Sequence, residues 1–116
     1  MECRADVIDF EKALSAMNGD KSLLNETLQD FVDYYADAGD KIGTAISKRR
    51  YHDAEIVSHT LKGLGATFAA AELNRSAEAL ETSLRDKAVD RLNDQLADLK
   101  EAIDQMVAAI GELLNK

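Results

Sequence analysis

The length, composition and charge of this chain restrict both its fold and its partners. At 116 residues, with no proline and only six glycines, it fits one helical domain with a single core. A net charge of −8 argues against nucleic acids and anionic membranes as partners, and no apolar run is long enough to cross a bilayer. The lone cysteine, Cys3, excludes an internal disulfide and a two-cysteine metal clip. We therefore expect one all-α, cytoplasmic domain over residues 1–116.

Apolar spacing predicts a short helix followed by a long one in the first half of the chain. Residues 6–17 are weakly amphipathic, and the turn Asn18-Gly19-Asp20 places Asp20 as the cap of the next helix. From residue 21 to about residue 48, apolar residues recur at steps of three and four, which indicates one buried stripe: Leu24, Leu28, Phe31, Tyr35, Ala38, Ile42 and Ala45. Because the phase continues through Gly39 and Gly43, we expect one long helix that bends at the glycines.

The second half of the chain predicts three further helices. Residues 49–52 read as a polar connection, and Asp53 is placed to cap a helix that runs to about Phe68. A helix over residues 71–86 and a last helix over residues 89–113 follow, because one helix across both segments would be unusually long. Helices with one apolar stripe and short connections pack as an antiparallel four-helix bundle, with the N-terminal segment capping one end.

The helix predicted around residue 59 presents a histidine on its polar side. On a wheel at 100° per residue, Val57, Leu61, Leu64 and Phe68 all lie about 140–200° from His59. His59 should therefore point away from the core. Four residues share its face, one or two turns away: Glu55, Lys62, Gly63 and Ala66.

Gly63 makes this face more than an ordinary solvated surface. A lone exposed histidine usually has no role, but a glycine at an exposed helix position costs roughly 1 kcal/mol relative to alanine. Stability given up locally suggests that another molecule approaches the helix closely there. Lys62 would then add a positive charge beside whatever His59 carries.

These residues resemble the signature of histidine-containing phosphotransfer domains. His59-Thr60-Leu61-Lys62-Gly63 is similar to their H-x-L-K-G motif. Other signature positions are matched before and after the motif, so that the resemblance covers residues 7–85: Gly19-Asp20, Phe31, Asp53, Leu73 and Leu80-Glu81. Many members have a glycine ten residues after the histidine, where this chain has Ala69, which leaves the end of the helix open.

The resemblance implies a phosphorelay intermediate built on a four-helix bundle. His59 Nε2 would accept a phosphoryl group from an aspartate of a response-regulator receiver domain, or through a hybrid histidine kinase, and pass it to another receiver. Mg²⁺ would be held by the receiver, so this chain would need no metal or cofactor of its own. Lys62 would offset phosphate charge, and Gly63 and Ala66 would let the partner approach. The chain would act as a monomeric phosphocarrier without kinase activity.

The sequence leaves two other functions open and argues against a third. A metal-dependent bundle enzyme needs inward-facing Glu-x-x-His pairs, and no glutamate here has a histidine three residues later. A helical interaction module with an idle histidine is possible. So is the phosphoacceptor domain of a chemotaxis-type histidine kinase, which an ATP-binding domain phosphorylates directly. The chain itself has no glycine-rich phosphate-binding loop.

Overall fold

Helices are the only regular elements between residues 7 and 115, which are the residues that the computed structural model describes. Cys3 lies outside them. In chain order, the elements are α1 (Phe10–Ala16), α2 (Lys21–Tyr35), α3 (Ala38–Ser47), α4 (Tyr51–Thr67), α5 (Ala71–Arg85), the 3-10 turn η2 (Val89–Arg91) and α6 (Leu92–Leu114). The predicted all-α class is confirmed. None of these helices combines the length and apolarity required to span a membrane.

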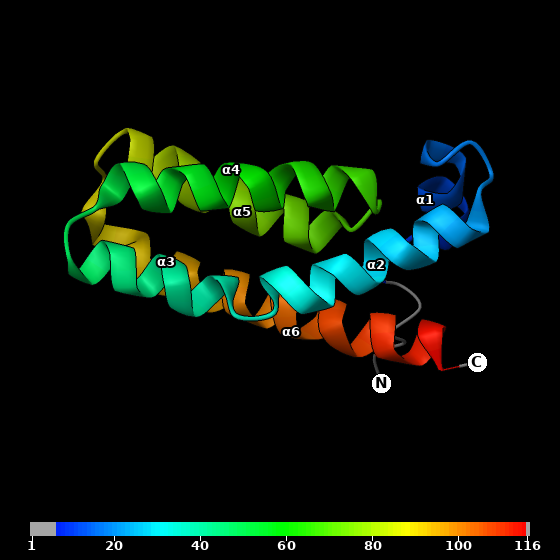
Figure 1. Cartoon of the computed structure of the whole chain (residues 1–116). Coiled ribbons are helices and arrows are strands. Elements are labelled where there is room, and N and C mark those ends of the chain that lie inside the picture. The colour runs from blue at the N-terminus through cyan, green and yellow to red at the C-terminus, as the bar shows by residue number, and fades with distance from the viewer. Residues whose placement is uncertain (1–6, 116) are drawn as a thin grey trace.

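The helices form an antiparallel four-helix bundle, as predicted. Figure 1 shows α2 and α3 following one another as one arm of the bundle, with α4, α5 and α6 running in alternating directions beside it. The short α1 lies at one end, where the backbone N–H of Asp9 donates to the carbonyl of Ala69 at 3.1 Å. Large side chains from all four arms are fully buried between the helices: Leu24, Leu28, Phe31, Ile42, Leu61, Phe68, Leu73, Leu80, Leu99, Ile103, Met106 and Ile110.

The prediction of one long helix over residues 21–48 is wrong, because the helix breaks at Ala36–Asp37. The carbonyl of Asp37 accepts the N–H groups of Asp40 and Lys41, which starts α3 afresh. The glycines are not the hinge. Gly39 lies inside α3, where a Cβ atom would come within 2.5 Å of the Lys100 side chain on α6. Glycine therefore serves packing there.

Two predicted helix starts shift, while the cap predicted at Asp20 is confirmed. Asp20 accepts from the N–H of Leu23 at 3.0 Å, as expected of an N-cap. Helix α4 begins at Tyr51, so Asp53 is not its cap but lies in its first turn. There its negative charge interacts favourably with the positive end of the helix dipole. Helix α6 begins at Leu92, and Val89 lies exposed in η2, outside the core stripe.

Ala69 ends α4 in the conformation that glycine favours. Its φ is +51°, and the flanking N–H of Ala70 donates to the carbonyl of Gly65 at 2.8 Å, which is the bond pattern of a Schellman motif. The chain therefore makes with an alanine a left-handed turn that glycine adopts more readily, at a cost of roughly 1–2 kcal/mol for the Cβ atom.

Candidate functional site

His59 lies in the middle of α4, and 68% of its side chain is exposed, in line with the helical wheel. The buried face of α4, however, is not centred on the large apolar residues from which the sequence predicted it. Val57 and Leu64 are only half-buried, whereas the fully buried positions are mostly small: Ala54, Ser58, Leu61, Gly65 and Phe68. Small side chains let α5 come close, so the buried face is rotated by about 50° toward that helix.

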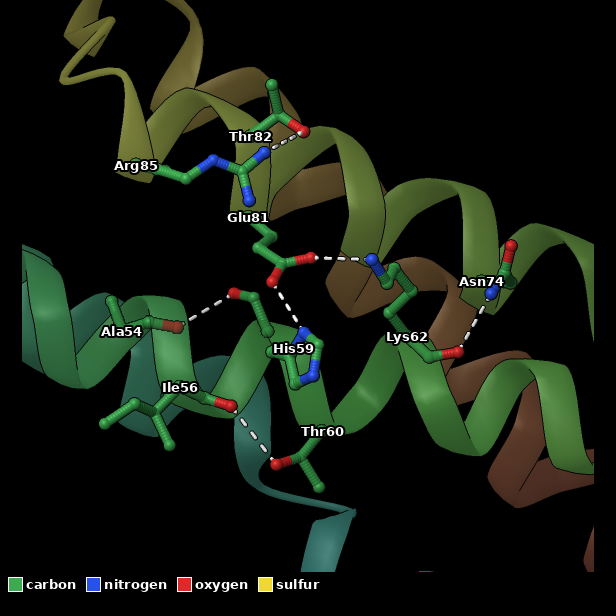
Figure 2. Close-up of polar contacts among 10 residues, drawn as sticks. Ala54, Ile56, His59, Thr60, Lys62, Asn74, Glu81, Thr82 and Arg85 are labelled. Carbon is green, nitrogen blue, oxygen red and sulfur yellow. Dashed lines mark hydrogen bonds and ion pairs between the residues drawn. The ribbon is translucent and has the colours of Figure 1, made fainter.

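This rotation brings His59 to the edge between α4 and α5, within reach of a carboxylate. Nδ1 of His59 lies 2.7 Å from Oε2 of Glu81 on α5, and the other carboxylate oxygen lies 3.2 Å from Nζ of Lys62. Only 6% of the Glu81 side chain is exposed. Figure 2 shows the carboxylate between the two side chains of α4. One buried carboxylate therefore serves both the histidine and the lysine.

Glu81 is charged in this position. Burial by itself would raise its pKa, but the hydrogen bonds from Lys62 and His59 and the charges of both outweigh that effect. The pKa of Glu81 is therefore held below the ordinary carboxyl value of 4.5. At neutral pH the side chain is a carboxylate that can only accept hydrogen bonds.

An ionised Glu81 decides which nitrogen of His59 carries the hydrogen. Since the carboxylate accepts, Nδ1 must donate in the 2.7 Å contact, and the neutral ring then holds its lone pair on Nε2. In Figure 2 that second nitrogen lies on the side of the ring away from Glu81. The arrangement presents an oriented imidazole with a free nucleophilic nitrogen on an exposed helix face.

The residues predicted to share the face of His59 do so. Gly63 and Ala66 are exposed, and a Cβ atom on Gly63 would meet nothing within 4 Å. Glu55 is half-buried one turn before His59. Lys62 is 33% exposed, and its ammonium is paired with Glu81. Between residues 7 and 115, no three His, Cys, Asp or Glu side chains are grouped so that they could hold a metal ion.

Sequence reasoning gave Glu81 no role and did not single out Gly65 and Asn74. A Cβ atom on Gly65 would lie 2.6 Å from the backbone nitrogen of Asn74, so α4 and α5 touch there. The Asn74 side-chain amide donates to the carbonyl of Lys62 at 2.9 Å. One signal was available for Glu81: it lies one turn after the buried Ala77, on the flank of an apolar stripe, where a charge needs a partner.

In the comparison with protein-family models, residues 26–109 match the model of the Hpt domain. No curated protein and no solved structure matches the chain. The matched range is more than two thirds of the chain and includes the whole of α4 and α5. It therefore contains both His59 and Glu81, whose buried carboxylate contacts the histidine ring. The chain therefore belongs to the Hpt domain family, whose members are phosphocarriers of two-component phosphorelays that act through histidine and interact with receiver domains and histidine kinases.

Proposed function

We propose that this chain is a phosphorelay intermediate in which Nε2 of His59 accepts a phosphoryl group from a receiver-domain aspartate and passes it to a second receiver. The chain acts as a cytoplasmic monomer without kinase activity and needs no cofactor of its own. The observation that carries the proposal is the 2.7 Å contact between Nδ1 of the exposed His59 and the buried carboxylate of Glu81. It leaves Nε2 as the nucleophile.

Transfer requires little covalent work from this chain. The lone pair of Nε2 attacks the phosphorus of the aspartyl phosphate, the P–O bond breaks, and the aspartate leaves as a carboxylate. The ring, which still carries its hydrogen on Nδ1, gains positive charge as the N–P bond forms, and Glu81 offsets that charge. The reverse steps deliver the phosphoryl group to the next aspartate. On the partner's side, the receiver would hold a Mg²⁺ ion, which would supply neutralisation of phosphate charge.

The surroundings of His59 suit a phosphoryl group and a close partner. Lys62 holds its ammonium 3.2 Å from Glu81 and next to His59, so it can turn toward the phosphoryl oxygens as their charge arrives. Gly63 and Ala66 leave the helix surface without long side chains, so receiver loops can approach the backbone. Glu55 borders this face one turn before His59.

A transfer assay with two matched histidine variants tests the proposal. The purified chain is incubated with a radiolabelled phospho-receiver, and acid-labile phosphate on the chain is measured. We expect His59→Gln to fold and accept no phosphate. His52→Gln is the matched control, because His52 is the only other histidine and is also exposed. This variant should accept phosphate as the wild type does. Label retained by His59→Gln, or lost in His52→Gln, overturns the assignment of His59.

The same assay separates the alternatives through the phosphodonor. ATP alone should give no label. Label from the ATP-binding domain of a chemotaxis-type kinase, with none from any receiver, would identify a direct kinase substrate and refute the relay. No label from any donor would leave a helical interaction module and would also refute it.

A further inference from the structure

Helices α4 and α5 are in backbone contact and hydrogen-bonded to each other beside the candidate site. At Gly65 the two helices touch, because a Cβ atom there would lie 2.6 Å from the nitrogen and 2.8 Å from the Cα of Asn74. Those are backbone atoms of α5, which cannot move aside as a flexible side chain can. At the same point, Nδ2 of Asn74 donates to the carbonyl of Lys62 at 2.9 Å (Figure 2). Contact and hydrogen bond together fix how far along α4 the helix α5 lies.

The register set at Asn74 determines where Glu81 lies. Asn74 and Glu81 are seven residues apart on α5, so they lie two turns apart on nearly the same face. Asn74 binds the backbone of Lys62, and Glu81 binds its ammonium at 3.2 Å and His59 at 2.7 Å. A slip of one residue along the helix axis moves a side chain by about 1.5 Å, which is enough to break a hydrogen bond of this length. Glu81 is buried and both of its carboxylate oxygens have partners, so its side chain has little freedom to compensate for such a slip.

We infer that Asn74 is a positioning residue of the phosphoacceptor site: its amide holds the α4–α5 register that places Glu81 against Nδ1 of His59. The consequence for phosphotransfer rests on the proposed function. The consequence for the histidine ring does not, because the hydrogen on Nδ1 follows from the Glu81 contact alone.

The test replaces the amide without changing its shape. Asn74→Asp keeps the packing against Gly65 but offers the Lys62 carbonyl no donor at neutral pH, and an acidic residue is compatible with the N-terminal part of α5. Asn74→Ala removes the amide without adding a charge. Arg75→Ala is the matched control, because Arg75 is the next residue on α5 and pairs with Glu72 at the surface.

The primary measurement is the position of the ring hydrogen, read from long-range ¹H–¹⁵N spectra at a pH where both histidines are neutral. His52 is an internal reference, because it is exposed and its side chain makes no hydrogen bond among residues 7–115. In the wild type, His59 should be mainly the Nδ1–H form. In Asn74→Asp and Asn74→Ala, it should shift toward the mixture that His52 shows. Transfer from a phospho-receiver should fall about fivefold, the factor that corresponds to the loss of one hydrogen bond.

The outcomes separate this inference from the proposed function. If both Asn74 variants keep the wild-type Nδ1–H form of His59, or if Arg75→Ala shifts the ring as much as they do, Asn74 is not a positioning residue. If the ring shifts as expected but His59→Gln still accepts phosphate, the inference about Asn74 holds and the proposed function fails.

Discussion

Replacing Glu81 by glutamine removes one negative charge from the α4–α5 contact and leaves the side-chain volume almost unchanged. The carboxylate accepts from His59 at 2.7 Å and lies 3.2 Å from the ammonium of Lys62. The single carbonyl oxygen of glutamine can serve one of these donors, and its NH₂ group must then face the other. A hydrogen bond to a charged group contributes about 1.5–3 kcal/mol. His59 is 68% and Lys62 33% exposed, so both can return to water. We therefore expect Glu81→Gln to lower the free energy of unfolding at neutral pH by about 1–1.5 kcal/mol.

The pH dependence of this deficit is specific to the charged carboxylate. Because the pKa of Glu81 in the folded chain lies below 4.5, its charge stabilises the fold above that value, and the stabilisation is lost as the pH falls through the folded pKa. Urea unfolding of wild type and Glu81→Gln, followed by circular dichroism, should show a gap that is full at neutral pH and much smaller near about pH 3. Glu78→Gln, on the exposed side of α5, is the control and should show no gap. A Glu81→Gln protein as stable as wild type at neutral pH, or equally deficient at both pH values, would refute the reasoning.

Three further variants test neighbouring features. Gly63→Leu should keep or raise the melting temperature, since a Cβ atom at this position meets nothing within 4 Å. Phosphate transfer from a receiver should nevertheless fall steeply, while the small donor phosphoramidate still labels His59; transfer at the wild-type rate would contradict a docking role for Gly63. Lys62→Met should slow receiver-to-histidine transfer without changing the Nδ1–H form of His59, as rates and ¹⁵N spectra would show; an unchanged rate would exclude Lys62 from the reaction. Ala69→Gly should raise the free energy of unfolding by about 0.5–1 kcal/mol in urea melts, because φ is +51° there, and a loss would show that the left-handed turn carries no strain.

Apolar periodicity was sufficient for the elements that pack along one continuous stripe. Leu73, Ala77, Leu80 and Leu84 are all buried on α5, where the pattern placed them. The break between α2 and α3 escaped the same reasoning, because the spacing carries on across Ala36–Asp37 as if the helix were unbroken. A stripe records which side of the chain is apolar. It does not record whether each backbone hydrogen bond along it is made.

The candidate site shows the same limit at the level of single residues. The wheel placed His59 at the surface because it weighed large apolar side chains, and that conclusion holds for any rotation of some tens of degrees. Whether His59 faces open solvent or a carboxylate depends on the rotation itself. That rotation is set by small residues, chiefly Gly65, where α5 can touch the backbone of α4. Because Glu81 follows His59 by 22 residues, no local spacing could join them. The contact forms only once the two helices are packed, and the register of that packing depends on Gly65, which has no side chain, and on the amide of Asn74.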